Sequence, residues 1–353
     1  MSDRTRLKNL PLDDASRGIL ALDEPRFRAQ QVLGWVYRKR VSSFDEMRNV
    51  SKQTRAKLAE RFTIDKLECP VRLVSSAGDA VKFGFRLVES DELVESVLLI
   101  DRKRRTACLS SQLGCGLGCT FCATGAMGFV RNLAQDEVVG QLIGINDYLA
   151  EQDDKPLTHV VFMGMGEALS NFDVFKSTCE IITAEVGFGL ADRRITVSTA
   201  GVVPSIDRLI REGPPVNLAI SLNTYSDELR SRTMPVNRTY PIAEVVAAGR
   251  RFVSATGRTL TFEYVVVEGE NDTPGAVDAL SRLLRGIPCK VNCIPLNPTS
   301  TGEGKSPPYE RILQFVQALH ERGITATARR SRGRDIDGAC GQLSTGAKRR
   351  DRQ

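Results

Sequence analysis

The run Gly114-Cys-Gly-Leu-Gly-Cys-Thr-Phe-Cys122 places Cys115, Cys119 and Cys122 in a C-x3-C-x2-C spacing. A cubane iron–sulfur cluster contains four irons, and proteins usually bind them through four cysteine thiolates. Three thiolates in one short loop would leave one iron open to chelate a small molecule. The glycines around the cysteines would let the loop wrap a bulky cluster. The spacing therefore predicts a cluster with one open iron.

Two other interpretations of these cysteines remain. Buried thiols often serve only as small apolar core residues. A zinc site normally takes four ligands in C-x2–4-C pairs, and the chain has only two histidines to complete such a set. We favour the cluster, which is the site used by enzymes that cleave S-adenosylmethionine (SAM) by radical chemistry.

The bulk composition is ordinary for a globular protein, with 353 residues, 41% hydrophobic and 26% charged. Residues 1–25 are polar and broken by Pro11 and Pro25, which disfavours a signal peptide. No stretch approaches the roughly 20 apolar residues that a membrane-spanning helix needs. The nine cysteines are therefore expected to be reduced thiols in a cytoplasmic protein.

The net charge of +6 is concentrated in basic clusters. They are Arg38-Lys39-Arg40, Arg102-Lys103-Arg104-Arg105, Arg329-Arg330 with Arg332 and Arg334, and Lys348-Arg349-Arg350. A single cluster is usually a solvated face, but four of them favour a polyphosphate partner such as nucleic acid.

Residues 1–66 are predicted to form short helices. A stripe of apolar residues recurs at helical spacing after Pro25 and comprises Phe27, Val32, Trp35 and Val36. This stripe predicts a core face, and the basic residues between its members could face RNA. From Val71 to Ile100 apolar and polar residues alternate, which predicts a small antiparallel sheet that connects two parts of the chain.

Beyond Arg105, strand patterns alternate with helical patterns. The strand candidates are Thr106–Ser110, His159–Met163, Ile195–Thr199, Val216–Leu222, Leu260–Val267, Cys289–Ile294 and Ile324–Ala328. Six or seven β/α units predict an α/β fold with a parallel sheet, open or barrel-like. Ligand sites in such folds gather at the carboxyl ends of the strands, and the cysteine loop follows the first strand.

Several motifs together carry a family resemblance. They are Gly114–Phe129 with Arg131-Asn132-Leu133, Val160–Glu167, Arg193–Pro204, Leu218–Leu222, Asn297-Pro298 and Asp335–Leu343. On these segments the chain resembles the RlmN/Cfr family of radical SAM RNA adenine methyltransferases along nearly its whole length, and is closest to the RlmN branch. The resemblance implies a partial (β/α)6-type barrel with a small N-terminal helical accessory domain.

The resemblance also implies a division of the chain. Residues 1–66 would be an accessory domain that binds RNA, residues 67–100 a β connector and residues 101–335 the radical SAM core. Residues 336–353 would carry a catalytic cysteine loop and a basic tail.

Two further cysteines take catalytic roles by resemblance. Cys340 would accept a methyl group from one SAM by displacement. A second SAM, bound to the open iron of one 4Fe–4S cluster, would yield a 5′-deoxyadenosyl radical that takes a hydrogen from the methylated Cys340. The resulting radical would add to the adenine, and Cys108 would attack the Cys340 sulfur to release the product through a transient disulfide. Glu95 would accept the proton that leaves the adenine carbon, although by itself it reads as a solvent-facing strand residue.

The resemblance further assigns SAM contacts. Gly164-Met-Gly-Glu167 follows a strand, so its glycines permit close backbone approach and Glu167 can accept from the SAM ammonium. The remaining implied contacts are Gly166, Ser198, Ser221, Leu222, Asn223 and Asn297. Asn223 stands where some family members have histidine.

The implied reaction is C2 methylation of adenine, at adenosine 2503 of 23S rRNA and adenosine 37 of certain tRNAs. The rival is a Cfr-like C8 methyltransferase that acts on the same rRNA adenosine and gives antibiotic resistance. Ala168 stands where the C2 branch often has proline, whereas Ser331-Arg332-Gly333 and Gly187–Leu190 favour the C2 branch. A less favoured alternative is a non-catalytic, metal-containing RNA-binding protein. A flavodoxin-like electron donor and a monomeric enzyme complete the expectation.

Overall fold

The computed structural model describes residues 4–88, 90–299 and 304–344. The basic cluster Lys348–Arg350, with the rest of the predicted tail from residue 345, lies outside the described residues.

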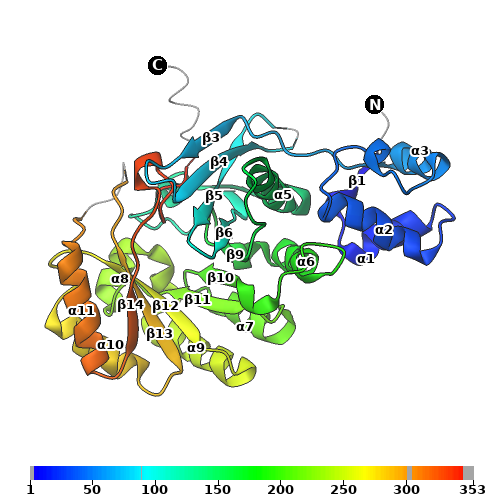
Figure 1. The fold of residues 1–353 in the computed structure, drawn as a ribbon. Helices are drawn as coiled ribbons and strands as arrows, with labels where there is room; N and C mark the ends of the chain where they lie inside the picture. The colour runs from blue at the N-terminus through cyan, green and yellow to red at the C-terminus, as the bar shows by residue number, and fades with distance from the viewer. Residues whose placement is uncertain (1–3, 89, 300–303, 345–353) are drawn as a thin grey trace.

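A ten-stranded sheet forms the centre of the molecule, in the order β14-β13-β12-β11-β10-β9-β6-β5-β4-β3 (Figure 1). Seven of its strands are parallel: β6 (Arg105–Cys108), β9 (His159–Phe162), β10 (Ile195–Thr199), β11 (Asn217–Ser221), β12 (Leu260–Val266), β13 (Cys289–Pro295) and β14 (Thr325–Ala328). All seven predicted strands are confirmed. Burial alternates along β9, β10 and β14, so one face of these strands packs into the apolar core and the other face is only partly covered.

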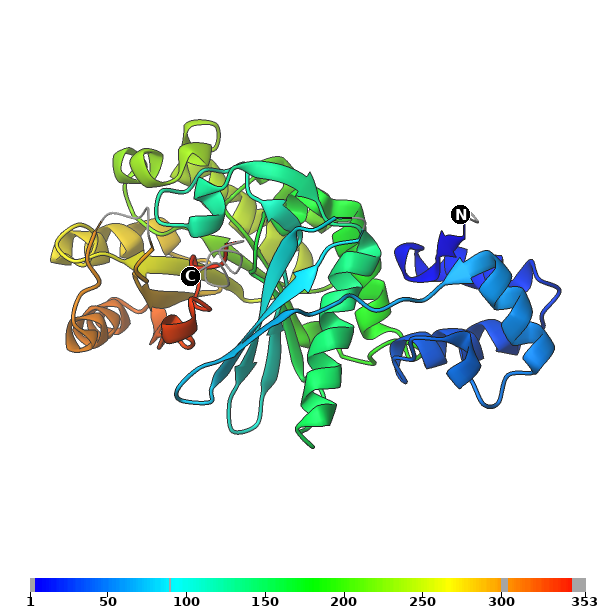
Figure 2. The same cartoon turned by 90° about the horizontal axis from the view of Figure 1, so that it is seen from above.

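Helices follow these strands along the chain and pack against the curved sheet (Figures 1 and 2). They are α5 (Gln135–Glu151), α6 (Phe172–Thr183), α7 (Val203–Glu212), α9 (Ile242–Thr256), α10 (Pro274–Leu284) and α11 (Tyr309–Glu321). The side chains between sheet and helices form one large apolar core. The predicted α/β fold class is therefore confirmed.

The antiparallel strands expected before the core are β3 (Val71–Val74), β4 (Ala80–Arg86) and β5 (Leu93–Ile100). Strand β5 pairs with β6 through Val97 and Cys108 in antiparallel register. These strands therefore extend the main sheet instead of forming a small sheet of their own. The extension matters for the site because it carries Glu95 alongside the first parallel strand.

The N-terminal region comprises α1 (Leu12–Leu20), α2 (Arg26–Tyr37), α3 (Lys52–Arg61) and a two-stranded pair of β1 (Thr5–Arg6) and β2 (Phe62–Thr63). It lies beside the sheet and has its own apolar cluster (Figure 2). Val139 and Ile143 of α5 and Ile181 of α6 belong to that cluster, so these helices anchor the region to the rest of the protein.

The predicted apolar stripe on α2 is only partly right. Val32 and Val36 are buried, but Phe27 is 58% exposed. Ala29 and Leu33 are buried instead. Each lies three residues before one of the buried valines, Val32 and Val36, and so belongs to the same face of the helix. Phe27 instead carries the guanidinium of Arg28 over its ring.

Among the described helices, none has the length and apolar character needed to cross a bilayer.

Candidate active site

The three-cysteine loop and a one-turn helix lie between the two strands of a short hairpin. Strands β7 (Gln112–Gly114) and β8 (Phe129–Asn132) pair on either side of it, and α4 (Ala123–Ala126) begins directly after Cys122. The Cys115 N–H donates to the carbonyl of Gly128 at 2.9 Å. A Cβ at Gly114 would lie 1.9 Å from that carbonyl oxygen, so only glycine lets the hairpin close here.

The loop gathers all three cysteines, which are half-buried. Burial raises the pKa of Cys115 to about 11, and it raises the pKa of Cys119 further, with Cys122 and Cys115 adding to the effect. The thiols of Cys115 and Cys119 are therefore neutral in the metal-free loop, and binding a metal would release their protons.

The donor set fits an iron–sulfur cluster. Three thiolates with no nitrogen or oxygen ligand suit soft metals and iron–sulfur centres. Among the described residues, no three Cys, His, Asp or Glu side chains lie close enough to share one metal ion. A cubane does not require such convergence, because each thiolate binds a different iron.

Glu167 occupies the predicted SAM motif after β9. Its carboxylate is buried, Oε2 accepts from the Ala200 N–H at 2.8 Å, and Oε1 is buried without a hydrogen-bond partner. Burial raises the pKa of Glu167 to about 7. A buried acceptor without a donor is costly, so the site fits a ligand that brings a cationic N–H group.

Gly166 precedes this carboxylate with φ +93°, and a Cβ there would lie 2.4 Å from the Cβ of Gln112. The Gln112 Oε1 accepts from the Glu167 N–H at 2.9 Å. Glycine is therefore required for the turn that aims Glu167 into the site.

The other predicted SAM contacts differ in what they can offer. Ser198 on β10 and Ser221 at the end of β11 are half-buried at neighbouring strand ends, and Asn297 has a buried Oδ1 without a partner. The Leu222 side chain is fully buried. The Asn223 amide accepts from Val265 N at 3.2 Å and donates to Met234 Sδ at 3.3 Å, so this side chain already braces the fold.

Arg230 is a site residue that sequence reasoning missed. It is 0% exposed and lies on α8 (Asp227–Thr233). Its guanidinium donates to Leu222 O at 3.1 Å, Asn237 Oδ1 at 2.9 Å, Ala200 O at 2.6 Å and Ser221 O at 3.1 Å. It therefore ties the carboxyl ends of β10 and β11 together, and its charge opposes the rise in the pKa of Cys119. A buried arginine is recognisable only from the fold, since the sequence around it reads as an exposed charged helix.

The Cys340 segment is fastened to the cysteine loop. The Ala123 N–H donates to Gly341 O at 2.7 Å, and the Thr124 hydroxyl donates to Leu343 O at 2.6 Å. Asn297 Nδ2 donates to Cys340 O at 3.0 Å. Cys340 is exposed, so its thiol is presented on the surface of this assembly.

Cys108 lies at the end of β6 and is buried. Burial raises the pKa of Cys108 to about 12, and the charge of a Cys340 thiolate adds to that rise, whereas Arg329 opposes it. Arg329 follows β14, and its own pKa is raised, first by Cys340 and also by Glu263 and Cys108. The structure thus brings the two cysteines together from opposite ends of the core, with one guanidinium beside both.

Glu95 is buried, with 1% of its surface exposed, so its interpretation as a solvent-facing residue was wrong. The Ser344 N–H donates to its Oε2 at 2.8 Å, and Lys82 Nζ lies 3.2 Å from its Oε1. Both faces of β5 are covered, which the alternation of its sequence does not reveal.

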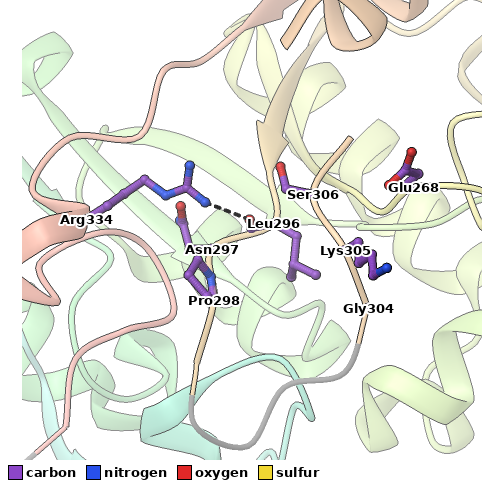
Figure 3. Close-up of a pocket in the computed structure, with 8 residues that line it drawn as sticks. All are labelled: Glu268, Leu296, Asn297, Pro298, Gly304, Lys305, Ser306 and Arg334. Carbon is purple, nitrogen blue, oxygen red and sulfur yellow. Dashed lines mark hydrogen bonds between the residues drawn. The ribbon is translucent and has the colours of Figure 1, made fainter. Parts of the chain in front are cut away.

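A cavity of about 370 Å³ lies at the carboxyl ends of β12 and β13 (Figure 3). Its lining comprises Glu268, Leu296, Asn297, Pro298, Gly304, Lys305, Ser306 and Arg334. Arg334 Nη2 donates to Leu296 O at 3.4 Å across one side of it. Asn297, which holds the Cys340 carbonyl, is the predicted SAM contact that lines this cavity.

The two histidines and several residues of the basic clusters have partners within the described structure. His159 Nδ1 lies 2.9 Å from Thr158 Oγ1, and His320 Nε2 lies 2.8 Å from Ala326 O. In the basic clusters, Arg40 pairs with Asp147 at 2.7 Å and Arg332 lies 3.3 Å from Asp101.

Comparison with known proteins extends this description. Residues 109–278 match the radical SAM superfamily, and residues 6–64 match the ribosomal RNA large subunit methyltransferase N-terminal domain. The dual-specificity RNA methyltransferase RlmN of Anaeromyxobacter sp. is 44% identical over 345 residues, covering 97% of this chain and 91% of the relative. The RlmN of Desulfotalea psychrophila is 42% identical, covering 97% of this chain and 96% of the relative.

Among solved structures, a radical SAM methyltransferase from Sphaerobacter thermophilus superposes with a TM-score of 0.91 at 44% identity. The match covers 97% of this chain and 99% of that protein.

Proposed function

We propose, from the premise that this chain belongs to the RlmN family of radical SAM RNA methyltransferases, that it methylates C2 of adenine in both rRNA and tRNA. The proposed targets are adenosine 2503 of 23S rRNA and adenosine 37 of tRNA. The observation that carries the proposal is that an exposed Cys340, on a segment hydrogen-bonded to the three-cysteine loop, lies near enough to the buried Cys108 for their charges to interact. A protein that only bound RNA would have no need of this pair.

Membership of the radical SAM superfamily implies a 4Fe–4S cluster and SAM. Once bound, they supply the methyl group and the one-electron chemistry that an unreactive ring carbon requires. We propose one cluster, held by Cys115, Cys119 and Cys122, and two SAM molecules per turnover. Glu167 and Asn297 each have a buried oxygen without a partner, which supports them as contacts to the polar groups of SAM. Gly166, Ser198 and Ser221 border the same strand ends, and we also retain Leu222 and Asn223 through their main chains.

The chain's own residues then divide the work. Cys340 is exposed and receives the methyl group, because a nucleophile must reach its electrophile. Cys108 stays protonated while it is buried, since its pKa is near 12, and so does not compete for the methyl group. It later attacks the Cys340 sulfur and releases the methylated base, and a reductant must restore both thiols.

Glu95 is proposed as the group that takes the proton from the adenine carbon. Burial raises the pKa of Glu95, while Lys82 and the Ser344 N–H lower it. A carboxylate held in this way can act as a base at neutral pH.

The RNA must present one base to a buried centre, so the target adenine is extruded from its stack. The N-terminal region, residues 1–66, is proposed as an RNA-binding accessory domain, with residues 67–100 as connector, 101–335 as core and 336–353 as the cysteine loop and tail. A flavodoxin-like donor, a monomeric state and a cytoplasmic location belong to the same proposal.

The rival reaction is methylation at C8, towards which Ala168 alone pointed. Ala168 is buried at the start of a 3₁₀ turn directly after Glu167. The similarity to proteins called RlmN over 97% of the chain supports C2 instead. Mass spectrometry of RNA modified by the reconstituted enzyme decides between them, because 8-methyladenosine in place of 2-methyladenosine would overturn the assignment.

The cysteine roles are tested with a Cys108→Ala variant. The protein is prepared anaerobically with iron and sulfide and incubated with SAM and an rRNA fragment. We expect a covalent protein–RNA adduct through Cys340, because the thiol that releases it is missing. Cys69→Ala, which removes a half-buried thiol that donates to the Val71 carbonyl, is the control and should release product normally. An rRNA fragment that stays free of protein in the Cys108→Ala reaction would exclude Cys108 as the resolving thiol.

A further inference from the structure

Lys82 and Glu95 form a buried ion pair between neighbouring strands. Lys82 Nζ lies 3.2 Å from Glu95 Oε1, and the two side chains are 7% and 1% exposed. Lys82 is in register with Val97 on β5, so it stands diagonally across the ladder from Glu95. Charged side chains are rarely buried to this extent unless they are paired.

The same lysine also contacts the segment that carries Cys340. Its Nζ donates to the Asp337 carbonyl at 3.4 Å, three residues before Cys340. Ser344, four residues after Cys340, donates its N–H to the other oxygen of Glu95. Lys82 and Glu95 therefore hydrogen-bond to the Cys340 segment on both sides of the cysteine, at Asp337 and at Ser344.

The groups that face Glu95 come from three directions. Lys82 on β4 is the cation that acts most strongly on it among the described residues, Asp337 in the C-terminal segment opposes ionisation, and Ser344 supplies a neutral N–H. The Glu95 N–H donates to Met165 Sδ, and its carbonyl accepts from the Ser110 hydroxyl. Burial favours the neutral acid, so ionisation of Glu95 depends on its cationic neighbour.

We infer that Lys82 is a positioning residue for the methyl transfer, which acts through Glu95 by keeping its carboxylate ionised and aimed at the substrate carbon. This inference rests on the proposed function, in which Glu95 is the base. Lys82 itself touches neither RNA nor SAM in this role.

The test compares Lys82→Met, Lys82→Arg and the wild type in single-turnover methylation at saturating RNA, from pH 6 to pH 9. A general base must be deprotonated to act, so loss of the lysine raises the pKa of Glu95 and moves the acid limb of the pH–rate profile upward. An opposite charge at this distance typically shifts a carboxyl pKa by about 1–3 units. At the acid end of this pH range we therefore expect Lys82→Met to react at least ~10-fold more slowly than the wild type, and at high pH we expect its rate to recover. Lys82→Arg keeps the charge and should restore most of the wild-type profile.

Lys8→Met is the matched control. Lys8 is also buried, donates to the Asp65 carbonyl and lies in the N-terminal region. Its loss removes a buried lysine without touching Glu95, so the acid limb should stay where the wild type has it.

A double-mutant cycle covers the case in which Lys82→Met does not fold. The Lys82→Met/Glu95→Gln double variant removes both charges together, so no unpaired buried charge remains. If Lys82 acts through Glu95, the double variant and Glu95→Gln alone should have equal residual rates. A further loss of more than ~10-fold in the double variant would overturn the inference, as would an unmoved acid limb in Lys82→Met. In both cases a wild type that makes 2-methyladenosine leaves the proposed function standing, whereas a wild type that makes none removes the proposed function itself.

Discussion

Replacement of Arg230 by methionine should destabilise the protein far more than loss of an exposed arginine. Methionine keeps most of the side-chain volume but offers no donor. The four acceptors within 3.1 Å of the guanidinium, which are Leu222 O, Asn237 Oδ1, Ala200 O and Ser221 O, would all lose this partner. Each lies where the 0% exposure of Arg230 leaves no access for water.

The magnitude follows from these contacts. A buried acceptor left without a donor costs about 1–3 kcal/mol, and neighbouring losses are not additive. Four acceptors on two strand ends therefore predict a loss of about 4 kcal/mol in the free energy of unfolding. Arg251→Met is the control, because Arg251 makes a two-pronged pair with Asp207 at 2.9 Å on the surface, with 48% and 31% exposure. Exposed pairs contribute about 0.2–1 kcal/mol.

The assay is thermal unfolding of the metal-free proteins, monitored by circular dichroism. For chains above 150 residues, 1 kcal/mol shifts the midpoint by roughly 2–4 °C or less, so Arg230→Met should melt about 5–10 °C below Arg251→Met. Midpoints that agree within about 2 °C would refute the claim that Arg230 supports the strand ends, since the lost hydrogen bonds would then have been replaced. The same variant should also take up less iron on reconstitution, because Arg230 lies beside Cys119.

Three further predictions concern individual side chains. The pKa of Glu167 is raised to about 7, so its negative charge is lost as the pH falls through that value. SAM affinity measured by equilibrium dialysis should therefore weaken from pH 8 to pH 6, by up to ~10-fold per pH unit. Glu167→Gln should remove most of this pH dependence. Iodoacetamide should label Cys340 at least ~10-fold faster than Cys108 in peptide mapping, because Cys340 is exposed and burial raises the pKa of Cys108 to about 12; equal rates would contradict the burial of Cys108. Gly166→Ala should abolish SAM binding, because the added Cβ would lie 2.4 Å from the Cβ of Gln112. Gly189→Ala is the control: this glycine also has a positive φ, but an added Cβ would have no atom within 4 Å, so the change should lower the free energy of unfolding by only about 1 kcal/mol.

The parallel strands could be predicted because their apolar runs leave few alternatives. Leu260–Val266 combines β-branched with aromatic residues and is bounded by turn residues, so local pattern and tertiary burial agree. The cluster-binding loop could also be predicted, because the C-x3-C-x2-C spacing of its cysteines is sufficient to suggest it. The proposed catalytic roles of Cys108 and Cys340 came only from the family resemblance, because these two cysteines share no local sequence signal.

What could not be predicted depends on tertiary packing. Lys82 and Glu95 are charged residues in the strands β4 and β5, and the segment that meets their charged ends comes more than 240 residues later in the chain. Phe27 fits the same helical spacing as Val32 and Val36, but the face of α2 that packs into the core also contains Ala29 and Leu33 and leaves Phe27 exposed. The roles of Cys340, Cys108, Glu95 and the SAM contacts remain predictions.

The hydrogen bonds from Ala123 and Thr124 to Gly341 and Leu343 join parts of the chain that emerge far apart during synthesis. Contacts of such high sequence separation form late, after local elements have folded. A growing polypeptide would thus contain all three cysteines of the loop long before Cys340 is added. A chain truncated before Cys340 would keep the proposed cluster ligands but lack the proposed methyl acceptor, so it should form no covalent adduct with RNA.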